Sequence, residues 1–424
     1  MLDLLVRNAT LPDGRTRMSI AVQDGRITEV TEGLTAPAHE TLDAQGLLLS
    51  PPFVDAHFHL DSALTYGQPR VNESGTLLEG IALWGELKPQ LTHDAIVERA
   101  LRYCDGAVAR GLLAIRSHVD TSHPSLLTVQ ALLEVRQRVA PYLDLQLVAF
   151  PQDGLLRAPD GLRNLQRALD LGVDVVGGIP HFERTQAMGA ESIRILCELA
   201  AAQGKRVDMH CDESDDPLSR HVETLAYETQ RVGLQGRVTG SHLTSMHSMD
   251  NYYVSKLIPL MAEAQLGVVA NPLINITLQG RHDSYPRRRG MTRVPELMAA
   301  GLTVAFGQDC VMDPWYGLGS ADMLEVAHMG LHVGQMTSQA AMRQCYEAVT
   351  TQPARLLGLE AYGLKAGCHA DFVLLHARDT VEAIRLRAAR LAVFRRGRQV
   401  ASSPAPLARL ALPGRPESVV FLAA

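Results

Sequence analysis

The stretch PPFVDAHFH, at residues 51–59, is the part of the sequence that most directly indicates how this chain folds. An apolar run at 47–49 leads into it, so it is typical of a buried strand whose carboxyl end carries ligand-type side chains. Side chains two apart on a strand lie on one face, and His57 and His59 could therefore bind one metal ion. A single His-x-His pair also occurs in cores and on surfaces, so the interpretation depends on the rest of the chain.

Three later strand-like runs also end in ionisable residues. They are VDMHCDE at 207–213, VTGSH at 238–242 and VAFGQD at 304–309. Together with the first run they supply three imidazoles and one carboxylate for a metal, namely His57, His59, His210 and Asp309. Glu213 and His242 are then left over for proton transfer.

Apolar β-type runs alternate with amphipathic helical patterns through the middle of the chain. The predicted strands are 53–60, 112–119, 143–150, 173–179, 206–212, 237–243, 267–273 and 303–309. Clear helical patterns, with apolar residues at i, i+3 and i+4, cover 94–110, 191–203 and 253–264. Eight strands with helices between them predict an α/β fold, a (β/α)8 TIM-type barrel. An open doubly wound sheet is the alternative, but no Gly-rich phosphate fingerprint follows the first strand.

Both chain ends have a different pattern, with short β-type runs separated by turn signals. Examples are 4–6 and 20–22 near the start, and 370–375 and 391–394 near the end. We expect the two ends to combine into one small β-sandwich. The predicted domains are therefore a sandwich from 1–50 and 364–424, and a catalytic barrel over 51–363.

Composition excludes several classes of protein. The 424 residues are 46% hydrophobic and 20% charged, with a net charge of -6, which favours neither nucleic acid nor an anionic membrane as partner. No apolar stretch approaches the roughly 20 residues that a membrane span needs. The six cysteines show no C-x-x-C pair, and no signal peptide is evident. We therefore expect reduced thiols and a cytoplasmic protein.

A barrel of this kind carries its active site at the carboxyl ends of its strands. Ligand-type and polar residues fall at or just past the ends of all eight predicted strands. They are His57, His59, His118, Gln152, His181, His210, Glu213, His242, Asn271 and Asp309. A histidine at one strand end is usually hydrogen-bonded or solvated. Ligand-type residues at the ends of the first, fifth, sixth and eighth strands are hard to assign to chance.

These motifs resemble the amidohydrolase superfamily and, within it, the bacterial cytosine deaminases, over nearly the whole chain. The matching stretches are 51–61, 75–77, 148–154, 179–183, 210–213, 270–276 and 313–316. They are long, ordered and spread over six strands, so the resemblance is specific.

The resemblance implies a hydrolase that acts on C–N bonds of cyclic amidines and deaminates a small pyrimidine, in the manner of pyrimidine salvage. It implies that His57, His59, His210 and Asp309 bind one divalent metal ion per chain, Zn²⁺ or Fe²⁺. Glu213 becomes the general acid/base, His242 a partner of the hydroxide on the metal, and Asp309 an acceptor of the water proton. It further implies a pyrimidine pocket that includes Gln152, Leu77 and Trp315, and a homo-oligomer.

Two rival metal arrangements fit less well. Two-metal members of the superfamily use a carboxylated lysine after the fourth strand, and none of the four lysines lies near 174–180, so we expect a mononuclear site. The zinc deaminases of nucleosides and polynucleotides carry H-x-E followed by P-C-x-x-C. Here His181 and Glu183 match only the first half, which we interpret as coincidence.

The sequence departs from the family pattern at Cys310, where cytosine deaminases usually carry a second aspartate. Neutral drift is one interpretation, since cysteine packs as a small hydrophobe. The other interpretation is that a neutral thiol in place of the aspartate lets this side of the pocket accept a substituent at C5 of the ring. One buried methyl contributes roughly 0.8 kcal/mol, so we expect 5-methylcytosine to be preferred or accepted as well as cytosine.

Three functions follow in order of preference. The first is hydrolysis of free cytosine or 5-methylcytosine to uracil or thymine plus ammonia. The second is the same chemistry on another amino-azaheterocycle, such as isocytosine or creatinine. The third is a barrel that only binds ligand, which should have lost metal ligands or Glu213. Imidazole and carboxylate suit Zn²⁺ and Fe²⁺ alike.

Overall fold

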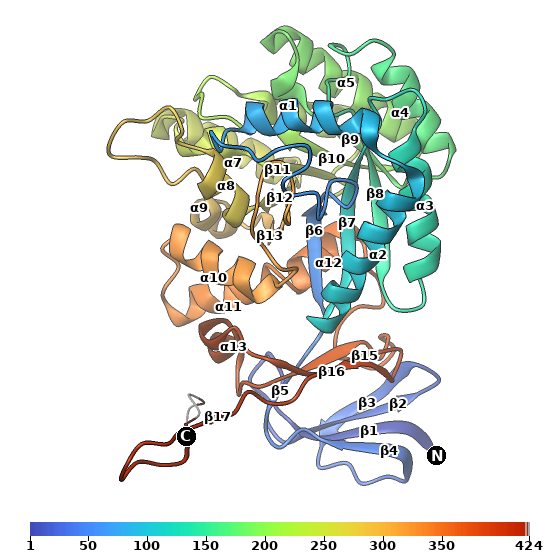
Figure 1. The fold of residues 1–424 in the computed structure, drawn as a ribbon, viewed down its shortest axis with the longest axis vertical. Coiled ribbons are helices and arrows are strands. Elements are labelled where there is room, and N and C mark those ends of the chain that lie inside the picture. The colour runs from blue at the N-terminus through green and yellow to red at the C-terminus, as the bar shows by residue number, and fades with distance from the viewer. Residues whose placement is uncertain (420–421, 423–424) are drawn as a thin grey trace.

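Eight parallel strands pair in chain order around the centre of the computed structural model, which describes residues 1–419 and 422 (Figure 1). The strands are β6 (Phe53–Phe58), β7 (Leu112–Asp120), β8 (Asp144–Phe150), β9 (Val175–Gly178), β10 (Arg206–Cys211), β11 (Val238–His242), β12 (Gly267–Ala270) and β13 (Thr303–Phe306). A parallel bridge between Phe58 and Asp309 brings the last strand's exit beside the first strand. The barrel is thus nearly closed, and the (β/α)8 prediction is confirmed.

Helices cover the outside of the barrel (Figure 1). They are α1 (Leu77–Leu87), α2 (His93–Ala109), α3 (Leu127–Val139), α4 (Gly161–Asp170), α5 (Gln186–Ala202), α6 (His221–Arg231), α7 (Asn251–Glu263), α8 (Pro272–Leu278), α9 (Val294–Ala299), α10 (Met323–Val333), α11 (Gln339–Glu347) and α12 (Thr351–Leu357). The side chains of Thr92, Thr185 and Asp250 cap α2, α5 and α7 by accepting a backbone N–H in the first turn. None of the described helices combines the length and apolar character that a membrane crossing requires.

Several barrel strands end one to three residues earlier than their apolar runs predict, and β6 ends at Phe58, so His59 follows the strand. The difference is largest, at three residues, in two strands. The expected strand 267–273 stops at Ala270, because Pro272 has no N–H for the strand ladder and begins α8. The expected strand 303–309 stops at Phe306, and Asp309 lies in a turn with a left-handed φ of 65°. Asn271 and Asp309 therefore project from turns rather than from pleated strands.

The two chain ends form two four-stranded sheets that share one apolar core, as expected (Figure 1). One sheet contains β1 (Leu2–Ala9), β2 (Met18–Gln23), β3 (Arg26–Glu32) and β4 (Ala38–Asp43); the other contains β5 (Leu48–Ser50), β14 (Phe372–Leu375), β15 (Arg390–Arg395) and β16 (Arg398–Ser402). Strand β5 pairs antiparallel with β14, which joins the two ends of the chain. Val6 and Ile20 from one sheet pack with Phe372 and Phe394 from the other.

Some of the last sixty residues lie outside this sandwich. Helix α13 (Thr380–Leu386) packs against α10 and α11, and β17 (Ala408–Arg409) and β18 (Ser418–Val419) pair only with each other. Residues 420, 421, 423 and 424 of the predicted terminal domain lie outside the described residues. The boundaries predicted for the two domains, at 50/51 and 363/364, stay a prediction.

Candidate metal and substrate site

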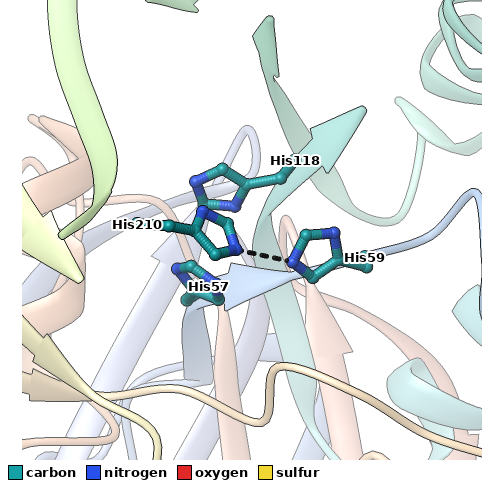
Figure 2. Close-up of side chains that lie close together, drawn as sticks. All are labelled: His57, His59, His118 and His210. Carbon is teal, nitrogen blue, oxygen red and sulfur yellow. Dashed lines mark hydrogen bonds between the residues drawn. The ribbon is translucent and has the colours of Figure 1, made fainter. Parts of the chain in front are cut away.

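Four imidazoles, those of His57, His59, His118 and His210, lie close together at the mouth of the barrel (Figure 2), and the Asp309 carboxylate lies beside two of them. His57 and His59 lie at the carboxyl end of β6, and His210 lies at that of β10. Nε2 of His57 and Nε2 of His59 lie 3.3 and 3.4 Å from Oδ1 of Asp309, and His59 Nε2 lies 3.0 Å from His210 Nε2. The four predicted ligands are therefore brought together.

These imidazoles have the chemistry that a divalent ion needs. Both ring nitrogens of His57 and Nδ1 of His210 are buried and find no hydrogen-bond partner in the part of the chain that the structure describes. Burial, reinforced by neighbouring imidazoles, holds the pKa of each ring well below its usual range, so both stay neutral with lone pairs available. Buried polar atoms without partners are costly, and the cluster is compatible with a divalent metal ion.

Two other groupings of possible ligands overlap the predicted set, and each shares three of its residues. The ligand atoms of His57, His59, His118 and His210 also lie within 4.8 Å of one another, as do those of His57, His210, His242 and Asp309. His118, on β7, places Nε2 3.6 Å from Oδ1 of Asp208, beneath the mouth. Sequence reasoning placed His118 at a strand end without giving it a role.

Glu213 and His242 flank the carboxylate of Asp309. His242 Nδ1 lies 3.5 Å from Oε1 of Glu213, and His242 Nε2 lies 3.9 Å from Oδ2 of Asp309. Burial, with the nearby charge of Asp309, raises the pKa of Glu213 well above its usual range. Glu213 can therefore carry a proton at neutral pH, which a general acid requires.

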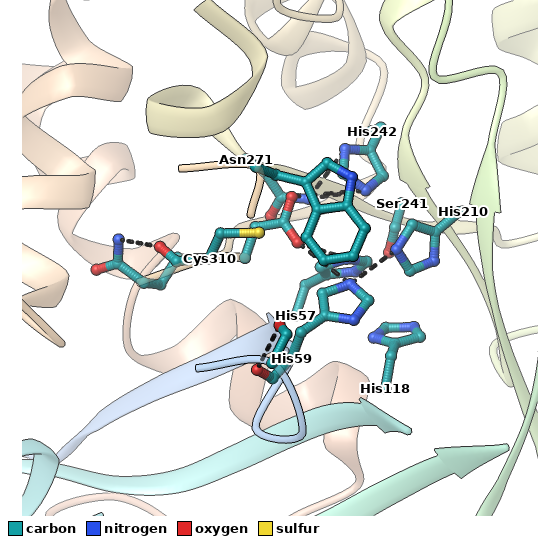
Figure 3. A network of polar contacts seen from close by, with 12 residues as sticks. His57, His59, His118, His210, Ser241, His242, Asn271 and Cys310 are labelled. Carbon is teal, nitrogen blue, oxygen red and sulfur yellow. Dashed lines mark hydrogen bonds and ion pairs between the residues drawn. The ribbon is translucent and has the colours of Figure 1, made fainter. Parts of the chain in front are cut away.

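The tautomer of His242, which lies beside Asn271 in Figure 3, is set by Asn275 on α8. Asn275 Oδ1 accepts the backbone N–H of Asn271, so Asn275 Nδ2 faces His242 Nδ1 at 3.0 Å and donates to it. Nδ1 is then the acceptor, and the ring proton lies on Nε2, the nitrogen nearest Asp309. Sequence reasoning missed Asn275; its spacing of one helical turn from Asn271 was the available signal.

A charged pair lies one layer below the imidazoles and was also missed. Arg116 and Asp208 are fully buried, with Nη1 of Arg116 2.8 Å from Oδ2 of Asp208. Ser241 donates to Oδ1 of Asp208 at 2.7 Å. Arg116 stands two residues before His118 on β7, and Asp208 two before His210 on β10, so each pair shares a strand face. That spacing was the signal in the sequence.

The predicted substrate residues line one cavity together with the reactive groups. The cavity holds about 370 Å³ of space free of protein atoms, part of it open to solvent. Its lining includes His59, Leu77, Gln152, His210, Glu213, Asp309, Cys310 and Trp315. Cys310 follows the end of β13, in the loop position expected for it, and its thiol contacts the carboxylate of Asp313. Burial raises the pKa of that thiol well above its usual range, so it stays neutral.

Residues 40–401 match the family described as the Amidohydrolase family, which is most of the chain. The chain belongs to the amidohydrolase family. This amidohydrolase is 41% identical to 5-methylcytosine deaminase from Klebsiella pneumoniae, solved with 5-fluorocytosine; the match covers 97% of this chain and 100% of that one, with a TM-score of 0.93.

More distant relatives extend the comparison. The structure of N-isopropylammelide isopropylaminohydrolase from Burkholderia multivorans is 27% identical, covers 95% of this chain and 99% of its own, and gives a TM-score of 0.83. Pterin deaminase from Rhizobium rhizogenes is 29% identical over 93% of both chains. The amidohydrolase is therefore a hydrolase that acts on C–N bonds of cyclic amidines, with a small-molecule substrate. A barrel that only binds ligand, the third function considered, does not agree with this.

Proposed function

We propose that this amidohydrolase binds one Zn²⁺ or Fe²⁺ and deaminates 5-methylcytosine and cytosine to thymine and uracil, with release of ammonia. One observation carries the proposal: a single cavity is lined by the candidate metal ligands His59, His210 and Asp309, by Glu213, and by all four candidate pyrimidine contacts. His57, His59, His210 and Asp309 would hold the ion. A bound divalent ion lowers the pKa of water toward neutrality and so supplies hydroxide for attack on the ring carbon.

The chain's own carboxyl groups move the protons. Asp309 turns Oδ1 toward His57 and His59, which leaves Oδ2 on the side of His242 to accept the proton of the attacking water. Glu213 gives its proton to the ring nitrogen next to the attacked carbon, which removes the charge that the adduct would otherwise carry. The amino group then takes the water's proton from Asp309 and leaves as ammonia. As the C–N bond breaks, the hydroxyl group of the adduct becomes the ring carbonyl and its proton passes to Glu213, while the ring nitrogen keeps the proton that Glu213 gave it. Atoms and charges then balance.

His242 orients groups rather than transferring a proton at Nδ1. Its Nδ1 lone pair is occupied by Asn275, so only its Nε2–H faces the reacting side of Asp309. The neutral ring, whose pKa burial keeps well below its usual range, donates one hydrogen bond in a fixed direction. A fixed donor beside a developing charge needs no reorganisation during the reaction.

Cys310 and Gln152 support the choice of a 5-substituted cytosine. Gln152 is buried at the cavity, and its side-chain amide makes no hydrogen bond within the described residues, so it can pair with the amide-like edge of a pyrimidine. The Cys310 thiol is neutral and small, which accommodates a methyl group without desolvating a charge. The 5-methylcytosine deaminase that is 41% identical acts on the substrate that this reasoning favours.

A second candidate is the same chemistry on another amino-azaheterocycle. The relatives named for N-isopropylammelide and pterin share the fold at 27–29% identity, so the family changes its substrate ring readily. Isocytosine and creatinine are the compounds that the sequence left open. A homo-oligomer, a cytoplasmic location and a part in pyrimidine salvage stay predictions.

A substrate screen tests the proposal. Purified protein reconstituted with Zn²⁺ or Fe²⁺ is given 5-methylcytosine, cytosine, isocytosine, creatinine, pterin and N-isopropylammelide, and ammonia release is measured. We expect the highest kcat/KM for 5-methylcytosine, with cytosine close behind. Turnover of another ring with neither pyrimidine deaminated would overturn the substrate assignment.

A further inference from the structure

The loop 151–157, which carries Gln152, is held from the neighbouring strand by one carboxylate that the reaction does not use. Glu183 follows the short helix η2 (Pro180–Phe182) at the end of β9. Its oxygens accept hydrogen bonds from three successive backbone amides, those of residues 155, 156 and 157, at 2.6, 3.0 and 2.8 Å. This residue belongs to the H-x-E match that the sequence left without a function.

A carboxylate satisfies this arrangement fully, and an amide does not. Three N–H donors need three acceptor sites, and a carboxylate offers acceptors alone, whereas an amide side chain would turn its own N–H₂ toward one of them. The contact is also close. Gly154 has a φ of +90°, and a Cβ there would lie 3.3 and 3.4 Å from the two Glu183 oxygens and 2.8 Å from Cβ of Arg157. Glycine thus lets the loop approach the carboxylate.

A second anchor holds the loop at the residue directly after Gln152. The backbone N–H of Asp153 donates to Oγ of Ser122 at 3.0 Å, and Lys88 Nζ lies 2.9 Å from Oδ2 of Asp153. Gln152 lies directly before Asp153, and Glu183 accepts hydrogen bonds from the backbone at residues 155–157, farther along the same loop. Since the side-chain amide of Gln152 has no hydrogen-bond partner among the described residues, its direction depends on how the loop backbone is held.

We propose that Glu183 is a positioning residue for substrate recognition, which holds the loop 151–157 so that Gln152 presents its amide to the edge of the bound ring. The inference deepens the proposed function and rests on it for the identity of the ring. Glu183 touches no reacting atom. Its loss should therefore weaken substrate binding through Gln152 while leaving metal binding and proton transfer in place.

The test compares Glu183→Gln with a matched control. Asp371 in the sandwich is equally buried, at 8% exposed for both residues, and also accepts a backbone N–H, that of Arg396. Amide hydrogen exchange is measured on the metal-loaded proteins without substrate. We expect faster exchange over residues 151–157 in Glu183→Gln and no change there in Asp371→Asn. Unchanged exchange in Glu183→Gln would overturn the proposal.

Kinetics separate a positioning role from a structural one. In Glu183→Gln we expect KM for 5-methylcytosine to rise about 3- to 10-fold with kcat within about 2-fold, the size of one lost hydrogen bond. Adding Glu183→Gln to Gln152→Ala should not raise KM further, because the carboxylate acts through Gln152. Additive increases, or faster exchange with an unchanged KM, would contradict the link to Gln152.

Two further arms keep the outcomes distinct. If the wild type deaminates no pyrimidine, the proposed function is overturned. The proposal for Glu183 can still be tested, because hydrogen exchange is measured without substrate. KM would then be measured with the ring that the substrate screen identifies. If Glu183→Gln does not fold, Glu183→Asp retains the charge with a shorter reach. It should show the same pattern of exchange and KM, and wild-type values in it would overturn the proposal.

Discussion

Two buried polar layers of the barrel, one above the other, differ in how their charges are compensated. In the lower layer Arg116 donates to Asp208, to Gln146 Oε1 and to the backbone oxygen of Leu356, each at 2.8 Å. Burial alone would raise the pKa of Asp208, but the nearby His118 ring and the Arg116 guanidinium outweigh this and lower it. Every charge in this layer has a partner.

The upper layer lacks such partners. Among the described residues, no Lys or Arg lines the cavity that Glu213 and Asp309 share, and His57 has no hydrogen bond at either ring nitrogen. Burying unpaired polar groups is unfavourable, so this layer needs a cation and a substrate to complete it. The lower layer therefore stabilises the barrel, whereas the upper layer leaves its polar groups free to bind a cation and a substrate.

The largest expected effect is loss of the metal. His210→Ala and Asp309→Ala should each lose the bound ion and all detectable deamination, because each change removes one of the proposed ligands. His118→Ala is the matched control, since it belongs only to the alternative grouping of four imidazoles; it should retain about one ion per chain. Elemental analysis of freshly purified proteins measures this. Loss of metal in His118→Ala with retention in Asp309→Ala would reverse the ligand assignment, and two ions per chain would contradict a mononuclear site.

Removing the proton carrier should have the next largest effect. Glu213→Gln keeps the shape of the side chain but cannot cycle a proton, so kcat should fall roughly 10²- to 10⁴-fold with the metal retained. Steady-state kinetics on the metal-loaded variant check this. Glu228→Gln, which changes a buried acid on α6 away from the cavity, is the control and should keep the wild-type kcat. Near-normal kcat in Glu213→Gln would move the proton-transfer role to Asp309 or His242.

Breaking the lower layer should cost stability. Arg116→Met leaves Asp208 buried without its main partner, so the free energy of unfolding should fall by about 3–5 kcal/mol. The double variant Arg116→Met/Asp208→Asn should lose less than the sum of the two single variants, because the remaining group is no longer charged. Urea unfolding of the metal-loaded proteins measures both. If Arg116→Met unfolds at the wild-type urea concentration, the two layers do not differ as described.

Substrate contacts in the upper layer should have intermediate effects. Gln152→Ala should raise KM, with a loss of about 1–3 kcal/mol in kcat/KM, because one edge of a buried ring would lose its hydrogen-bond partner. The metal content should not change. Unchanged kinetics would mean that the ring binds in another orientation and would favour the isocytosine or creatinine alternative.

The smallest expected effect concerns selectivity at C5. Cys310→Asp should lower kcat/KM for 5-methylcytosine relative to cytosine, since it replaces a neutral wall with a charged one. A buried methyl is worth roughly 0.8 kcal/mol, or about a 4-fold change in the ratio. Cys310→Ser should keep the wild-type order. Both substrates are measured on all three proteins, and an unchanged ratio in Cys310→Asp would show that this side chain does not face C5.

Much of the fold was determined by the sequence itself. Apolar runs at strand length, alternating with helical periodicity, are local patterns, and all eight barrel strands and the paired β-rich ends followed from them. The His-x-His spacing on a strand likewise predicts two imidazoles on one face, and His57 and His59 both approach Asp309. Patterns of this kind can be read because the partners lie a few residues apart or follow a repeated geometry.

Only the tertiary structure decided which distant groups meet. Asp309 reaches His57 because its chain leaves β13 in a left-handed turn and bridges to β6, which apolar periodicity does not encode. The pairing of Arg116 with Asp208 and the grip of Glu183 on residues 155–157 depend on strand register around a nearly closed barrel. Register is set by the packing of the whole sheet. The residues next to a side chain in the sequence therefore predict which face of a strand or helix it lies on. They do not predict which distant side chain it contacts.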